Sequence, residues 1–145
     1  RRPASLFVAD FIGGANFLEG LVLERNREES SIKLRGGLKV SVEDTTHAVD
    51  EPVIIIVREE KTSLTAPSSG QPNALWGEVR AKRFLGGFTR YETRLENGDE
   101  VACRIPTMRA PPLSAGDKVS VSFAPRDALV YSYPSLGLRR ELEVI

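Results

Sequence analysis

The fold is decided at residues 6–20, which read LFVADFIGGANFLEG. Apolar residues recur at helical spacing from 6 to 12, and the glycine pair at 13–14 can end a helix in conformations that other residues avoid. An apolar stretch at 17–23 follows directly and suits a strand. We therefore expect one short helix that leads straight into a strand, with β structure beyond it.

The rest of the chain has the sequence pattern of a β protein, in which short alternating runs are separated by the turn-forming residues Gly, Pro, Asn and Asp. Alternation on both sides of residues 35–37 predicts a hairpin. Residues 53–57, VIIIV, predict a central strand that is covered on both faces. Asn97-Gly98 predicts a type I′ turn with positive φ at both residues. A small OB-type barrel is suggested by short strands at 75–85, 88–95, 100–105, 118–123 and 128–131.

The predicted fold class is therefore all-β, with OB-like barrels of short antiparallel strands and one N-terminal helix. A loop rich in Pro, Ser and Gly marks the clearest division. The predicted parts are a helix at 1–14, an N-terminal β lobe at 15–64, the loop at 65–74, a C-terminal OB-like lobe at 75–133 and a tail at 134–145.

Bulk composition excludes several classes of partner. The formal net charge is +0, so long-range attraction to nucleic acid or to an anionic membrane is not expected. Cys103 is the only cysteine, which excludes an internal disulfide and fits a reducing cytoplasm. No apolar run approaches the roughly 20 residues that a membrane helix needs. The first residue is not Met, so we expect a fragment or a processed product.

Residues suited to catalysis or metal binding are scarce. A nucleotide-binding P-loop needs Gly-x-x-x-x-Gly-Lys-Ser/Thr, whereas the glycine pairs here are isolated and interpreted as turns. His47 is the only histidine, which we place in an exposed turn, and Cys103 is expected to pack on a strand. The acidic pairs 28–29 and 59–60 are interpreted as solvated surface. The chain is therefore predicted to hold no catalytic residue, metal or cofactor.

Several short motifs follow one another along the chain. They are FVADFIG at 7–13, NFLEGLV at 16–22, VREE at 57–60, GEV at 77–79, LG at 85–86, TRYETRL at 89–95 and GDKVSVSFAPRD at 116–127. Together these motifs resemble one known family, the C-terminal TOBE-type regulatory domain of ATP-binding subunits of ABC importers. The resemblance is greatest to the spermidine/putrescine branch and covers residues 7 to about 131. One departure is Glu59, which stands where the family pattern I-R-P-E has proline.

The resemblance implies a non-catalytic role. Such domains follow an ATPase domain, are similar to paired OB-like barrels, hold the ATPase dimer together and in some members sense a regulator. For this chain it implies a helix that leads in from a missing ATPase domain, where ATP and Mg²⁺ would bind. The implied partners are a second copy of the chain, that ATPase domain and the transporter's membrane subunits, with no nucleic acid. The implied location is cytoplasmic, at the inner face of the membrane, and the implied solute is a polyamine or a similar small solute.

The resemblance also marks residues that would contact a ligand or a partner. We further expect Phe7, Phe11 and Phe17 to make a two-fold contact between copies. The candidate ligand or interface residues within the matching motifs are Asn16, Arg58, Glu60, Thr89, Arg90 and Tyr91.

An oxyanion-binding sensor is one alternative function. Small barrels that bind molybdate carry S-A-R-N-x-L-x-G-x-V, and residues 13–22 match the second half of this pattern but lack its Ser and Arg. Anion binding would then rest on backbone N–H groups and the Asn16 amide, with the Glu19 carboxylate nearby.

An OB-type module for single-stranded nucleic acid is the other alternative. Barrels of this kind stack bases on aromatic rings and track phosphates with basic groups. Strict alternation puts odd-numbered residues from 79 to 83 on one face and even-numbered residues from 80 to 84 on the other. Such mixed faces favour an interface over a binding groove. The basic and aromatic segment comprises Trp76, Arg80, Lys82, Arg83, Phe84, Phe88, Arg90, Tyr91 and Arg94.

Overall fold

The computed structural model describes residues 14–134, and within that range the regular structure is β-strands with short 3₁₀ turns. The helix expected at 1–14 and the tail at 134–145 therefore fall almost wholly outside the described residues. The strands are β1 (Ala15–Arg25), β2 (Ser30–Leu34), β3 (Lys39–Val42), β4 (Pro52–Arg58), β5 (Thr62–Thr65), β6 (Leu75–Leu85), β7 (Phe88–Leu95), β8 (Glu100–Pro106), β9 (Lys118–Phe123) and β10 (Ala128–Ser132).

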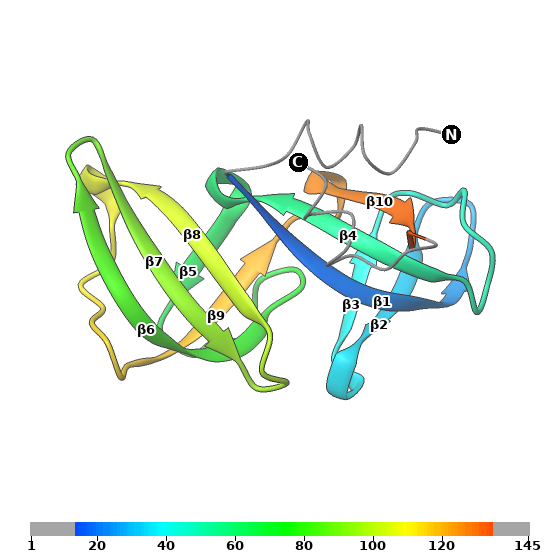
Figure 1. Ribbon diagram of the computed structural model, residues 1–145, viewed down its shortest axis with the longest axis horizontal. Helices are drawn as coiled ribbons and strands as arrows, with labels where there is room; N and C mark the ends of the chain where they lie inside the picture. Colours follow the sequence, from blue (N-terminus) through cyan, green and yellow to red (C-terminus); the bar gives the residue numbers. More distant parts are fainter. Residues whose placement is uncertain (1–13, 135–145) are drawn as a thin grey trace.

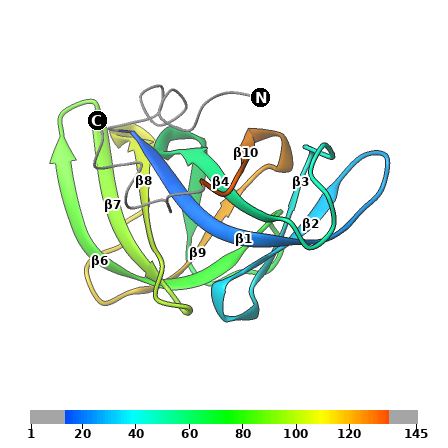
Figure 2. The same ribbon diagram turned by 45° about the vertical axis from the view of Figure 1, so that its right-hand side comes forward.

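The strands form two antiparallel five-stranded sheets that lie side by side (Figure 1). The first sheet has the order β10-β4-β1-β2-β3, and the second has the order β5-β9-β6-β7-β8. The edge strands of the second sheet, β5 and β8, approach each other, so this sheet nearly closes into a barrel. The long strand β1 runs from the second sheet across the first one (Figure 2). The all-β, OB-like fold class is confirmed.

The strand pairing crosses the boundary that the loop at 65–74 marks in the sequence. β5 lies on the N-terminal side of this loop but pairs with β9 in the second sheet. β10 lies near the C-terminal end but pairs with β4 in the first sheet. The strand at 128–131 was expected to be the fifth strand of the C-terminal barrel, and this is wrong because β5 occupies that place. Each sheet is thus completed by one strand from the other side of the loop at 65–74.

One hydrophobic core joins the two sheets. Val53, Ile55 and Val57 of β4 point into it, together with residues of β6 to β9. Ile54 and Ile56 point to the other side of the sheet, and they are also almost fully buried. The prediction of a central strand with two covered faces is therefore confirmed.

The turn between β7 and β8 differs from the expected type I′ hairpin. Only Gly98 has a positive φ, of 90°, and its N–H donates to the Leu95 carbonyl at 2.9 Å. Asn97 is not in the left-handed region, and its side-chain amide donates to the Arg35 carbonyl at 2.8 Å. The result is a three-residue loop that closes with glycine in the left-handed region.

A β-bulge in β6 changes which side chains share a face. The register with β7 shifts between Val79 and Ala81, so Arg80 is an extra residue. Lys82 lies opposite the buried Tyr91 and shares its face of the sheet, although Lys82 itself is exposed. The expected alternation, which put Val79 and Ala81 on one face, is therefore wrong, because an inserted residue reverses the faces of the positions that follow it.

Candidate functional site at the junction of the two sheets

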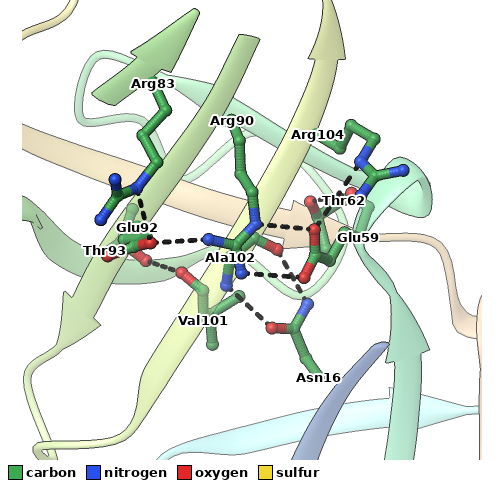
Figure 3. Close-up of polar contacts among 10 residues, drawn as sticks. All are labelled: Asn16, Glu59, Thr62, Arg83, Arg90, Glu92, Thr93, Val101, Ala102 and Arg104. Carbon is green, nitrogen blue, oxygen red and sulfur yellow. Dashed lines mark hydrogen bonds and ion pairs between the residues drawn. The ribbon is translucent and has the colours of Figure 1, made fainter. Parts of the chain in front are cut away.

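Two of the six predicted site residues, Asn16 and Arg90, lie where the start of β1 and the 3₁₀ turn Glu59–Lys61 meet β7 and β8 (Figure 3). We call the polar contacts at this place the junction network. It is built from Asn16, Glu59, Thr62, Arg83, Arg90, Glu92 and Arg104.

Asn16 links the first sheet to the edge of the second. Its amide N–H donates to the Ala102 carbonyl at 2.9 Å, and its carbonyl oxygen accepts from the Ala102 N–H at 2.8 Å. The side chain thus makes the pair of bonds that a neighbouring strand would make to β8. Asn16 is 7% exposed, so both bonds are shielded from water.

Arg90 forms the centre of the junction network. Its Nε and Nη2 each donate to one Glu59 oxygen at 3.0 Å, in the two-pronged geometry that suits guanidinium and carboxylate. Its Nη1 also donates to Glu92 at 2.6 Å. The hydrogen bonds that Arg90 donates to Glu59 are the first cause that raises the pKa of Arg90 above its ordinary value. Arg90 is therefore committed to internal contacts.

Glu59 is the network residue that the sequence reasoning missed. The pair 59–60 was interpreted as solvated surface, but Glu59 is 6% exposed and also lies 3.8 Å from Arg104 Nε. That interpretation is wrong for Glu59 because the turn after β4 points its side chain across to β7. The sequence signal was that Glu59 stands where the family pattern has proline. A buried carboxylate needs a cation partner, and Arg90 provides it here.

The other predicted residues lie apart from this centre. Arg58 and Glu60 form an exposed pair at 3.2 Å. The pKa of Glu60 is lowered, first by a hydrogen bond from its own backbone and then by Arg58. Thr89 contacts the Thr107 hydroxyl, and the buried Tyr91 hydroxyl donates to the Pro111 carbonyl at 2.6 Å. The predicted set is therefore split among a network, a surface pair and the core.

The chemistry of the junction network is structural. Its carboxylates are paired with guanidinium groups, so none is poised as a base. The neighbouring thiol of Cys103 is fully buried, as expected, and burial raises its pKa to about 11, which keeps it protonated at neutral pH. Arg104 has a buried Nε without a hydrogen-bond partner among the described residues, and its guanidinium lies 5.7 Å from the Phe88 ring centre. Such a network holds two sheets in a fixed relation.

Two other predictions concern side chains outside the network. Phe7 and Phe11 lie outside the described residues, and Phe17 packs against Ile54 and Ile56. The prediction that His47 is exposed is wrong, since its side chain is 14% exposed. It is covered because its ring contacts the Val130 carbonyl at 3.2 Å.

Glu51 lies beside His47 and holds the same region together. Its carboxylate accepts hydrogen bonds from the Ser132 hydroxyl at 2.6 Å and from the Ala48 N–H at 3.0 Å. The Ser132 bond is the first cause that lowers the pKa of Glu51 below its ordinary 4.5. These bonds fasten the loop before β4 to the end of β10.

Comparison with known proteins defines the class of this chain. The family model described as the TOBE domain matches residues 55–130, which run from β4 to β10. This segment includes Glu59, Arg90 and Arg104, and therefore most of the junction network. The chain belongs to the TOBE domain family.

Its relatives include ATP-binding proteins named for spermidine/putrescine import. PotA of Rubrobacter xylanophilus is 38% identical over 132 residues, which are 88% of this chain and 34% of that protein. PotA 1 of Pseudomonas aeruginosa strain PAO1 is 30% identical over 131 residues, covering 89% of this chain and 35% of that protein. The chain thus spans about a third of the length of these curated relatives.

A solved structure shares the fold. The cytoplasmic molybdate-binding protein ModG, in a crystal form with molybdate bound, matches with a TM-score of 0.74 and 20% identity. The match covers 83% of this chain and 98% of that one. At this identity the likeness supports the fold alone. Within residues 14–134, no helix has the length and apolar character needed to cross a bilayer.

Proposed function

We propose that this chain is the regulatory and dimerisation domain of the ATP-binding subunit of an ABC importer, for polyamines or a similar small solute. The observation that carries the proposal is the match to spermidine/putrescine import ATP-binding proteins over 88% of the chain. Because the chain covers 34% of that relative, the ATPase domain, with ATP and Mg²⁺, would be supplied by the rest of the parent protein. The domain would then work in the cytoplasm beside the membrane subunits.

The geometry is consistent with a role in holding other parts together. The two sheets share one core, and the junction network fixes their relation through Asn16, Glu59 and Arg90. A rigid double barrel can carry an interface without changing shape when its partner binds. The Cys103 thiol is buried and the Glu59 carboxylate is paired with Arg90, so both contribute to packing within the domain.

The test uses the protein that the complete gene encodes, with and without residues 14–134. We expect deletion to weaken association of the subunits, so that ATP hydrolysis falls at low protein concentration and recovers at high concentration. This pattern separates lost dimerisation from a damaged ATPase site. A deletion that leaves both the rate and its concentration dependence unchanged would contradict the proposal.

An oxyanion sensor is the second candidate, suggested by the likeness to a molybdate-binding protein. Against it, both polar ends of the Asn16 amide are engaged by the Ala102 backbone, so an anion there would have to displace two buried hydrogen bonds. Calorimetric titration with molybdate distinguishes the two. Saturable binding that is lost in Asn16→Ala would favour the sensor.

A further inference from the structure

A cavity of about 510 Å³ opens on the second sheet, beside the loop that precedes β6. Trp76, the only tryptophan of the chain, lines this cavity and is 46% exposed. Tryptophan is highly buried on average, so one left open in a cavity is an informative exception. Pro67 and Leu95 add further apolar surface. We call this cavity the Trp76 pocket, and its volume is in the range of small-molecule sites.

The walls of the Trp76 pocket are held in place before any ligand arrives. The Ser68 N–H donates to the Ser120 hydroxyl at 2.8 Å, and that hydroxyl donates to the Ser68 carbonyl at 2.7 Å. These bonds fasten the loop that carries Pro67 to β9. Trp76 lies opposite Ser120 in the sheet, and its carbonyl accepts the Glu96 N–H at 3.1 Å. A preformed site spends little binding free energy on ordering itself.

Positive charge is in excess on one side of the pocket. Lys118 donates to Glu78 at 2.8 Å, and this bond is the first cause that lowers the pKa of Glu78, with Arg80 and Arg94 contributing further. Three cations therefore surround one carboxylate. Arg94 also contacts Glu100 at 3.3 Å, but Arg80 has no hydrogen bond or ion pair among the described residues. The guanidinium of Arg80 is thus available to an anion.

We propose that the Trp76 pocket binds a small planar anion, with its aromatic ring stacked on Trp76 and its anionic group held by Arg80 and Arg94. A free nucleoside monophosphate has this chemistry. Bases stack well on indole rings, and guanidinium groups donate charge-assisted hydrogen bonds to phosphate oxygens. Glu96 also lines the pocket and can accept from an exocyclic amine of the base. The proposal does not depend on the transporter assignment.

A free nucleotide fits better than a nucleic-acid strand. The pocket has room for a ligand of nucleotide size, and the carboxylates of Glu78 and Glu96, which also line it, would repel additional phosphates. The chain also has a formal net charge of +0, whereas binding to strands depends on many neutralised phosphates. The occupant is therefore a single small anion.

The test titrates the 145-residue chain with AMP and follows the fluorescence of Trp76, with adenosine and oligoadenylate in parallel. AMP is expected to quench the fluorescence saturably, with a dissociation constant below about 1 mM. Adenosine should bind at least about tenfold more weakly, because it lacks the charge that Arg80 and Arg94 hold. Added salt should weaken AMP binding and leave adenosine binding unchanged.

Matched variants locate the site. Arg80→Gln should weaken AMP binding about tenfold, whereas Arg27→Gln, an exposed change between β1 and β2 and outside the pocket, should not. Trp76→Leu, followed by calorimetry, should abolish binding. The proposal is overturned if AMP does not saturate, if adenosine binds equally well, if Arg27→Gln acts like Arg80→Gln, or if oligoadenylate binds more tightly than AMP.

Discussion

Glu59 shows how one residue can connect the two sheets. It stands where the family pattern has proline, and the residue is 6% exposed. Both of its oxygens accept hydrogen bonds from Arg90, and Arg104 lies within 3.8 Å. Removing one partner of such a pair leaves the other charge without compensation, which is costly at a buried site.

Glu59→Gln is therefore expected to lower the free energy of unfolding by about 2 kcal/mol, as for a lost hydrogen-bonded charge. The matched control is Glu60→Gln, since Glu60 forms an exposed pair with Arg58 that should be worth about 0.5 kcal/mol or less. Urea denaturation of the two variants measures the difference. Equal losses would mean that the buried contact with Arg90 contributes no more than a surface pair.

Glu51 gives the fold a predicted acid sensitivity. Its pKa in the folded state is below 4.5, so the folded form binds fewer protons than the unfolded form. The stabilisation is therefore present above that pH and is lost as the pH falls through the folded pKa.

Glu51→Gln is expected to reduce the free energy of unfolding by about 1 kcal/mol at neutral pH, because the hydrogen bonds to a charged acceptor weaken. The difference from the parent chain should shrink as the pH is lowered below 4.5. Urea denaturation at neutral and acidic pH checks this, with Glu43→Gln as an exposed acidic control. A difference that persists at low pH would show that the carboxylate charge is not the cause.

At the scale of elements, the β2–β3 hairpin presses against the β7–β8 turn. Arg35 contacts Asp99 at 2.6 Å, and Asn97 donates to the Arg35 carbonyl at 2.8 Å. Gly36 lies so close that an added Cβ would come within 2.9 Å of Asn97 Cβ. The neighbouring Gly37 has open space around it.

Substitutions at these two glycines distinguish backbone strain from a steric clash between the β2–β3 hairpin and the β7–β8 turn. Gly36 has φ of 76° and Gly37 has φ of 88°, so alanine at either position should cost about 1 kcal/mol of stability. Gly36→Ala should cost more, because its Cβ also meets Asn97 across the two elements. Thermal unfolding of both variants measures this, and Gly37→Ala as the more damaging change would contradict the contact.

Local patterns in the sequence predict elements well where burial is strong. The apolar run of β4 indicates two covered faces, and the glycines after β2 indicate a hairpin, both as found. Pairing between strands that are distant in the sequence leaves no such local pattern. The exchange of β5 and β10 between sheets depends on pairing of strands that are far apart in the sequence, such as Thr62 with Phe123 and Ser132 with Val53, and the bulge at Arg80 depends on register with β7.

The candidate site was predictable only in part for the same reason. The motif led to Arg90 and Asn16, but their partners, Glu59 and the Ala102 backbone, are distant in sequence. Tyr91 belongs to the same motif yet lies in the core, because neighbouring strand residues face opposite sides. A motif therefore identifies a segment, whereas the strand pairing within the sheet determines what each side chain of that segment contacts.

At the scale of the whole molecule, the proposed function requires two copies to associate. We expect light scattering to show a molar mass that rises from that of one chain toward twice that value as the concentration increases. Mass action requires this of any dimer. A chain that stays strictly monomeric at high concentration would count against dimerisation through this domain alone.

The central claim is that this TOBE domain is part of an ATP-binding subunit, and the reading frame before the codon for Arg1 tests it most directly. The account predicts a Walker A motif and an ABC signature in the same frame as this chain, which would place the ATPase domain on the same polypeptide. A stop codon followed by a start site immediately upstream would contradict it. The chain would then be a free-standing double barrel.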